Sequence, residues 1–186
     1  MTADVRDWIE TFTGARFSPL RPDPALVRVA DIAHSLAYTC RYRGHCSRYY
    51  SVAEHSVLVS RYVPSHLALE GLLHDAAEAY LGDVPRPLKR QPEMLAYGIA
   101  EARVEACVAA RYGLRTDPEA LAAVKEIDSR VLWDEILALM RPEHHEDTRD
   151  IVESLGGPLG CTVEGLLPER AEFEFLRRFN EIGRRA

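Results

Sequence analysis

The chain has 186 residues, 47% of them hydrophobic, which suits one sizeable core, and we expect a single domain over residues 1–186. Acidic residues (29) outnumber lysine and arginine (23), and the resulting net charge of −6 opposes binding to a polyanionic backbone, which excludes a nucleic-acid polymer as a partner. Without a signal-peptide pattern or an apolar run of about 18 residues, we expect a cytoplasmic protein that has no membrane partner. The four cysteines form no CxxC pair, which indicates reduced thiols.

Helical periodicity begins about thirty residues into the chain. Ser51 and Glu54 have the spacing of a capping box, in which each side chain binds a free amide at a helix start. Gly82 is a natural stop for the buried segment before it. The helices expected in the first half are residues 31–42, 52–62 and 66–81.

The second half carries the clearest helix of the chain. Asp117 is a suitable N-cap and Pro118 suits the first helical position, and apolar residues then recur at helical spacing as far as Met140. Strand-like alternation is absent from the sequence, so the predicted fold is all-α, with no sheet or a trivial one. The helices expected in this half are residues 95–112, 118–140 and 168–182.

Four side chains that can bind a metal lie where packing alone favours apolar residues: His55, His74, Asp75 and Asp128. Asp128 shares a helical stripe with core valines, where an unpaired carboxylate costs several kcal/mol. His74 and Asp75 follow two leucines on a segment predicted to be buried. Histidine and carboxylate ligands from three helices form a site between those helices with positions open to water and substrate, as catalytic metal sites have.

The order of these ligands resembles that of the HD-domain metal-dependent phosphohydrolases. The strings YSVAEHS (50–56) and HDAAEAYLGD (74–83) resemble those of the small 5′-deoxynucleotidase branch, and the resemblance spans roughly residues 31–132. It implies an all-helical HD-domain bundle, one divalent metal ion (Mn, Co, Mg, Zn or Fe) and hydrolysis of phosphate esters, most often in 5′-deoxynucleotides.

Two further carboxylates belong to the same motif. Glu78 follows His74 by four residues, so on a helix its carboxylate lies on the metal face, and Asp83 lies just past the expected helix end. The resemblance implies that these two residues are catalytic, one in water activation and the other in protonating or orienting the leaving group. Which residue has which role stays open.

Cationic side chains before the first histidine predict a phosphate-binding segment. Arg41 is the preferred match to the arginine that contacts phosphate in related nucleotidases, Arg43 is the second choice, and His45 is a further candidate. Lys89, together with Arg86, is expected to add a second basic edge.

These observations predict a hydrolase that removes phosphate from 5′-deoxynucleoside monophosphates. Three alternatives stay open: a deoxynucleoside triphosphate triphosphohydrolase, a non-catalytic nucleotide-binding HD scaffold, and a cyclic-nucleotide phosphodiesterase. The expected partner is a small phosphorylated molecule, and a homodimer is compatible with the sequence. Base, sugar and physiological metal are not specified by the motif, because fold-level likeness indicates chemistry better than substrate.

Overall fold

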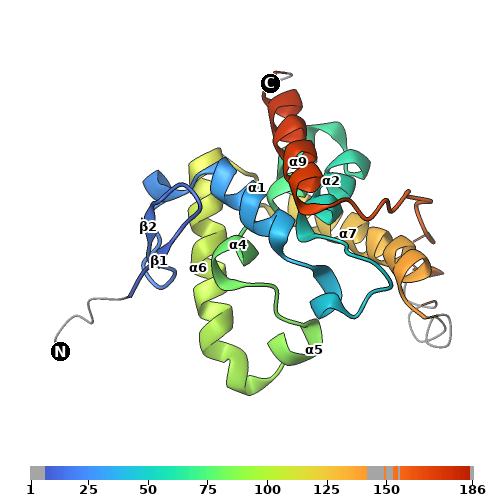
Figure 1. Cartoon of the computed structure of the whole chain (residues 1–186), viewed down its shortest axis with the longest axis horizontal. Helices are drawn as coiled ribbons and strands as arrows, with labels where there is room; N and C mark the ends of the chain where they lie inside the picture. Colours follow the sequence, from blue (N-terminus) through green and yellow to red (C-terminus); the bar gives the residue numbers. More distant parts are fainter. Residues whose placement is uncertain (1–6, 142–148, 150–152, 155, 185–186) are drawn as a thin grey trace.

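A computed structural model describes residues 7–141, 149, 153–154 and 156–184, and it is a helical bundle (Figure 1). The long helices are α1 (Val29–Tyr38), α2 (Val52–Tyr62), α6 (Leu95–Tyr112), α7 (Pro118–Leu139) and α9 (Pro168–Gly183). The short α-helices are α3 (Ala68–Leu73), α4 (Glu78–Leu81) and α5 (Arg86–Lys89). Turns of 3-10 helix lie at η1 (Pro24–Leu26), η2 (Arg41–Gly44), η3 (Ser65–Leu67) and η4 (Pro92–Met94). The strands β1 (Ile9–Glu10) and β2 (Arg16–Phe17) pair antiparallel, so the all-α prediction with a trivial sheet is confirmed.

The capping predictions are confirmed at two helix starts. The Ser51 hydroxyl accepts a hydrogen bond from the amide of Glu54 at 3.1 Å, and α2 begins at the next residue. The Asp117 carboxylate accepts from the amide of Ala120 at 3.0 Å, ahead of α7. These local bonds satisfy amides that have no partner within the helix, which fixes where each helix starts.

The single helix expected over residues 66–81 is wrong, because the chain breaks at the HD pair. It forms η3, α3 and α4, and the backbone between α3 and α4 turns through residues 74–77. The His74 imidazole donates to the carbonyl of Gly71 at 2.9 Å, and that carbonyl is the acceptor that a continuous helix offers to the amide of Asp75. The amide of Glu78 bonds instead to the carbonyl of Asp75, three residues back. Residues 74–77 therefore form a tighter turn between α3 and α4.

The helix expected over residues 31–42 is also too long. α1 ends at Tyr38, and the following residues pair with the segment before α2: the amide of Arg41 donates to the carbonyl of Tyr50 at 2.9 Å. η2 then contains two residues with left-handed backbone, Tyr42 and Arg43, at φ of 55° and 54°. Arg41 therefore lies at the start of a strained 3-10 turn and not on the expected α-helix.

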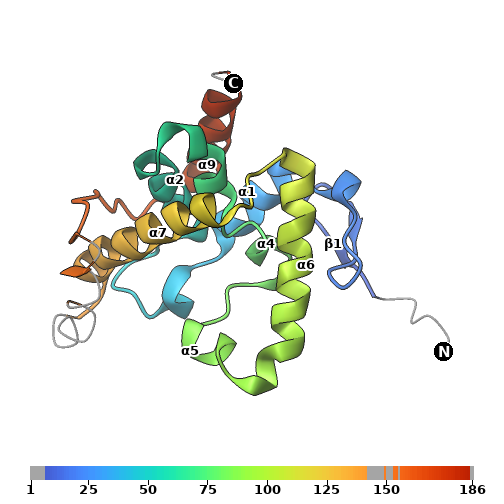
Figure 2. The same cartoon turned by 180° about the vertical axis from the view of Figure 1, so that it is seen from behind.

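α2 occupies the centre of the bundle and contacts α1, α3, α7 and α9. Residues 52–60 are all buried, and Figures 1 and 2 show α9 alongside α2 in both views. Gly71 allows α3 to approach α2 closely, since an added Cβ would come within 2.9 Å of the Val63 side chain and 3.1 Å of the Ser60 backbone. The close approach brings the end of α3 to His55.

In the part of the chain that the structure describes, no helix combines the length and the hydrophobicity needed to cross a membrane. The four cysteines are free thiols, as expected.

Candidate metal centre

Four predicted ligands converge between α2, α7 and the turn after α3. His55 Nε2 lies 3.3 Å from His74 Nε2 and 3.7 Å from Asp75 Oδ2, and His74 Nε2 lies 3.2 Å from the same oxygen. These three side chains form a group that could hold a metal ion. Asp128 Oδ1, from α7, lies 3.3 Å from His55 Nε2 and adds a fourth ligand atom. Around a cation with bonds of about 2.1 Å, neighbouring ligand atoms are separated by roughly 3.0–3.4 Å, so the spacing fits.

The hydrogen bonds of the two imidazoles support a cation between them. His55 Nδ1 contacts Glu135 Oε1 at 2.5 Å, and His74 Nδ1 contacts the carbonyl of Gly71 at 2.9 Å. Both acceptors are oxygens, so each Nδ1 carries a proton and each ring turns its Nε2 toward the cluster. Two lone pairs that face each other at 3.3 Å repel unless a proton or a cation lies between them. The donor set of nitrogen and carboxylate oxygen suits a divalent transition metal.

The charges of the cluster shift its pKa values. Burial and the charge of Arg41 lower the pKa of His55, but the carboxylates of Glu135 and Asp128 outweigh them and raise it to about 9. Burial raises the pKa of Asp75, but the positive charges of His74, His55 and Arg41 outweigh it and hold the pKa below its usual range. The pKa of Asp128 is likewise lowered, against its burial, chiefly by His55. The carboxylates are therefore ionised and ready to bind a cation.

Glu135 on α7 is a site residue that the sequence analysis missed. It is fully buried, and its carboxylate accepts from the hydroxyls of Tyr42 and Tyr50 at 2.8 Å each. The same carboxylate contacts His55 Nδ1 and forms an ion pair with Arg41 at 3.1 Å. It therefore joins a predicted metal ligand, His55, to the predicted phosphate-binding arginine. Its position seven residues after Asp128, on the same helix face, is the sequence signal that indicates it.

Glu78 and Asp83 lie on the same side of the cluster and line one cavity with Asp75. Glu78 is buried, and burial together with the charges of Asp75 and Asp83 raises its pKa to about 8. Glu78 Oε1 lies 3.4 Å from the Lys89 ammonium, while the buried Oε2 has no hydrogen-bond partner among the residues that the structure describes. A carboxyl group that keeps its proton near neutral pH and has one free oxygen can donate or accept a proton.

The cavity beside Glu78 holds about 680 Å³ and is called the basic cavity here, because its five lysine and arginine side chains outnumber its four carboxylates. Its charged and titratable lining comprises Arg41, Arg43, His45, Asp75, Glu78, Asp83, Arg86, Lys89, Lys125 and Asp128. All four side chains predicted to bind substrate are thus brought together there. Arg41 contacts Asp75 at 3.6 Å, whereas Arg43 donates to the backbone carbonyl of Asp83. The Lys89 ammonium lies 2.6 Å from Glu101, so carboxylates already neutralise much of its charge.

A second cavity, of about 640 Å³, lies on the other side of the ligand cluster, between α6 and α7. Its wall is mostly aliphatic, with leucine, valine and alanine side chains from both helices. It shares Asp75, Lys125 and Asp128 with the basic cavity, so these three residues mark the junction between the two. A molecule with an apolar body and an anionic end fits such a pair of cavities.

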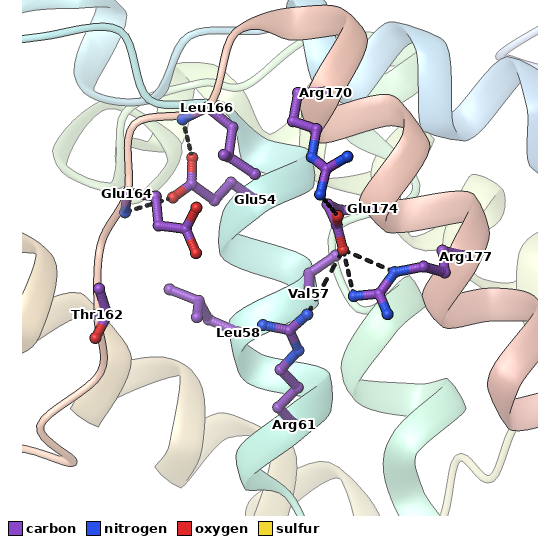
Figure 3. A pocket seen from close by; sticks show the side chains of 10 residues that line it. All are labelled: Glu54, Val57, Leu58, Arg61, Thr162, Glu164, Leu166, Arg170, Glu174 and Arg177. Carbon is purple, nitrogen blue, oxygen red and sulfur yellow. Dashed lines mark hydrogen bonds and ion pairs between the residues drawn. The ribbon is translucent and has the colours of Figure 1, made fainter.

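A third cavity, of about 220 Å³, lies apart from the cluster, between α2 and α9 (Figure 3). Three arginines surround Glu174 there: Arg61 at 3.8 Å, Arg170 at 2.6 Å and Arg177 at 2.5 Å. Its lining has three acidic residues for these three arginines, so it has no excess charge to bind an anion. Glu54, one of the three, accepts from the backbone amides of residues 164–166. The contacts join α2 to α9 and to the segment before it.

No family model matches the chain. The chain is 35% identical over 182 residues to the uncharacterized protein YfdR of Escherichia coli, covering 94% of this chain and 95% of YfdR. It is 37% identical over 120 residues to the uncharacterized protein RCAP_rcc00048 of Rhodobacter capsulatus, covering 59% of this chain and 60% of that protein. The HD phosphohydrolase DatZ of cyanophage S-2L, solved with dA and one catalytic Zn²⁺ ion, is similar with a TM-score of 0.50. The two share 20% identity over 81% of this chain and 95% of DatZ, which shows a common fold.

Proposed function

Since the chain belongs to the same family as YfdR and has the fold of the HD-domain phosphohydrolases, we propose that it is a metal-dependent phosphohydrolase. The observation that carries the proposal is the convergence of two imidazole Nε2 atoms and two carboxylates where a basic and an aliphatic cavity meet. The proposed ligands are His55, His74, Asp75 and Asp128. A divalent ion bound there supplies a Lewis acid for a phosphoryl oxygen and lowers the pKa of a coordinated water.

The residues of the chain position the phosphate and manage its protons. Arg41 is held by Glu135 and contacts Asp75, so its guanidinium is fixed beside the ligand cluster before any substrate binds. A fixed guanidinium offers paired donors to phosphoryl oxygens and stabilises the charge that develops on them. Glu78, with its proton retained near neutral pH, and Asp83 lie on the same wall and exchange protons with water and the leaving group.

The proposed substrate is a 5′-deoxynucleoside monophosphate, which is cleaved to a nucleoside and phosphate. The aliphatic cavity has a volume in the range that holds a drug-sized ligand, and it suits a nucleoside while the basic cavity suits its phosphate. DatZ was solved with dA and a catalytic Zn²⁺, so its fold accommodates a deoxynucleoside beside a metal. This precedent favours a nucleotide over other phosphate esters.

A deoxynucleoside triphosphate is the second candidate, cleaved to a nucleoside and triphosphate. The length of the cationic lining favours it, because arginines 41, 43 and 86 are spread along the basic cavity and offer donors to more than one phosphate, although four carboxylates line it too. Product identity separates the two reactions.

The test is incubation of the protein with each deoxynucleoside mono- and triphosphate plus Mn²⁺, Co²⁺ or Mg²⁺, followed by chromatography of the products. His74→Ala is the blank, and His66→Ala, which changes an exposed histidine outside the described site, is the matched control. Nucleoside plus orthophosphate from monophosphates supports the main proposal, and nucleoside plus intact triphosphate supports the second. Binding of nucleotide without turnover by any metal-loaded form would contradict both and favour a non-catalytic scaffold.

A further inference from the structure

Lysine is rare in this chain, and its positions are informative. The 23 basic residues include only two lysines, Lys89 and Lys125, and both line the basic cavity. The ammonium of Lys89 contacts Glu101 and Glu78. Lys125 is different, because it also lines the aliphatic cavity and so lies where the two cavities meet.

The contacts of Lys125 place its charge beside the ligand cluster. Lys125 Nζ donates to Asp128 Oδ2 at 2.5 Å, whereas the other oxygen of that carboxylate faces His55 Nε2. One carboxylate therefore joins the ammonium to the proposed cation position. An ammonium has three N–H donors, and within the described part of the chain Lys125 uses one of them, on Asp128. The side chain is 60% exposed, so the remaining donors are accessible from the cavities.

We propose that Lys125 is a phosphate-binding residue, which Asp128 holds at the junction of the two cavities. The inference rests on the proposed function, because it assigns Lys125 to the phosphate of that substrate. A phosphate beside the ligand cluster then meets Arg41 on one wall and Lys125 on α7. Lysine suits this place because it is a compact point charge on a flexible stem and can follow a phosphoryl oxygen as it moves.

The electrostatics of Lys125 distinguish this role from a merely structural one. A positive charge next to Asp128 repels a cation bound by the same carboxylate and so weakens metal affinity. If Lys125 only orients Asp128, its presence instead strengthens metal binding, and its removal misplaces Asp128 and lowers the metal affinity. The sign of the change in metal affinity therefore separates the two roles.

The first experiment measures substrate KM and Mn²⁺ affinity in Lys125→Met. We expect KM for a deoxynucleoside monophosphate to rise about 10- to 100-fold, as for loss of a charged hydrogen bond, while Mn²⁺ binds as tightly as before or more tightly. Lys125→Arg retains the charge and should recover part of the loss. Arg103→Met, which removes a surface charge on α6, is the control. A KM within twofold of the parent, or a loss of Mn²⁺ affinity that accompanies the rise in KM, would overturn the proposal.

The second experiment does not depend on turnover. With two lysines in the chain, an amine-reactive acylating reagent and mass spectrometry report each side chain separately. We expect Mn²⁺ plus inorganic phosphate to protect Lys125 from acylation severalfold, and Mn²⁺ plus chloride not to protect it. If no nucleotide is hydrolysed, the proposed function fails, but protection by phosphate still supports this inference and unchanged reactivity refutes it.

Discussion

Replacement of Glu135 by glutamine tests whether this buried carboxylate organises the site. The carboxylate receives four contacts, from Tyr42, Tyr50, His55 and Arg41, which together use all its acceptor positions. A glutamine side chain has the same shape but one acceptor oxygen and an NH₂ group that cannot accept. At least one buried donor then loses its partner, and Arg41 loses the closer of its two carboxylate partners among the described residues and keeps only Asp75, at 3.6 Å.

The size of the effect follows from the burial of these groups. Glu135 is fully buried and the Arg41 side chain is only 14% exposed, so water compensates a small part of the loss. Breaking one partner of a buried ion pair costs about 3–5 kcal/mol, and we expect Glu135→Gln to lower the free energy of unfolding by that amount. Loss of the acceptor behind His55 should also weaken metal binding by about 10- to 100-fold.

The assay is urea denaturation of the chelated protein together with a Mn²⁺ titration. Glu126→Gln is the matched control on α7, because Glu126 is exposed and forms an ion pair with Arg130 at 3.6 Å. We expect a change within about 0.5 kcal/mol for this control. If Glu135→Gln has the stability and the Mn²⁺ affinity of the parent, Glu135 does not position His55.

Three further changes test other parts of the site. Chelation should lower the melting temperature of the parent protein and leave that of His55→Ala unchanged, as calorimetry would show, because only the parent binds the ion. Burial raises the pKa of Glu78 from 4.5 to about 8, so the folded state retains a proton that the unfolded state loses, and chelated protein should lose stability as pH rises from 5 to 8. Glu78→Gln should remove about 2–5 kcal/mol of that loss in denaturation curves. If the free energy of unfolding falls equally with pH in both proteins, Glu78 does not have the raised pKa. Glu54→Gln should cost about 2 kcal/mol in urea without changing Mn²⁺ affinity, since it weakens three bonds to backbone amides.

The sequence was sufficient to predict the structure where local signals determine it. Ser51 and Asp117 fixed the starts of α2 and α7, because a side chain that binds the free amides of the first turn acts within four residues. The cluster of His55, His74, Asp75 and Asp128 was predicted because polar side chains at buried helical positions require a partner. Their order along the chain then matched a known pattern.

The sequence was insufficient to predict the structure where contacts between side chains and distant segments determine it. The break at His74 depends on a bond from its imidazole to the carbonyl of Gly71, which competes with the helical bond that periodicity assumes. Glu135 appeared to be an ordinary helix residue, because its partners Arg41 and Tyr50 lie more than 80 residues earlier in the chain. Only the folded bundle brings these side chains together.

The most direct test of the proposed function is the rate of orthophosphate release from a deoxynucleoside monophosphate as Mn²⁺ is added stepwise to the chelated protein. We predict that the rate rises in proportion to bound metal and reaches its maximum at one ion per chain, because the cluster around His55 and His74 forms one site. Release that is independent of metal, or no release at full occupancy, would contradict a metal-dependent phosphohydrolase.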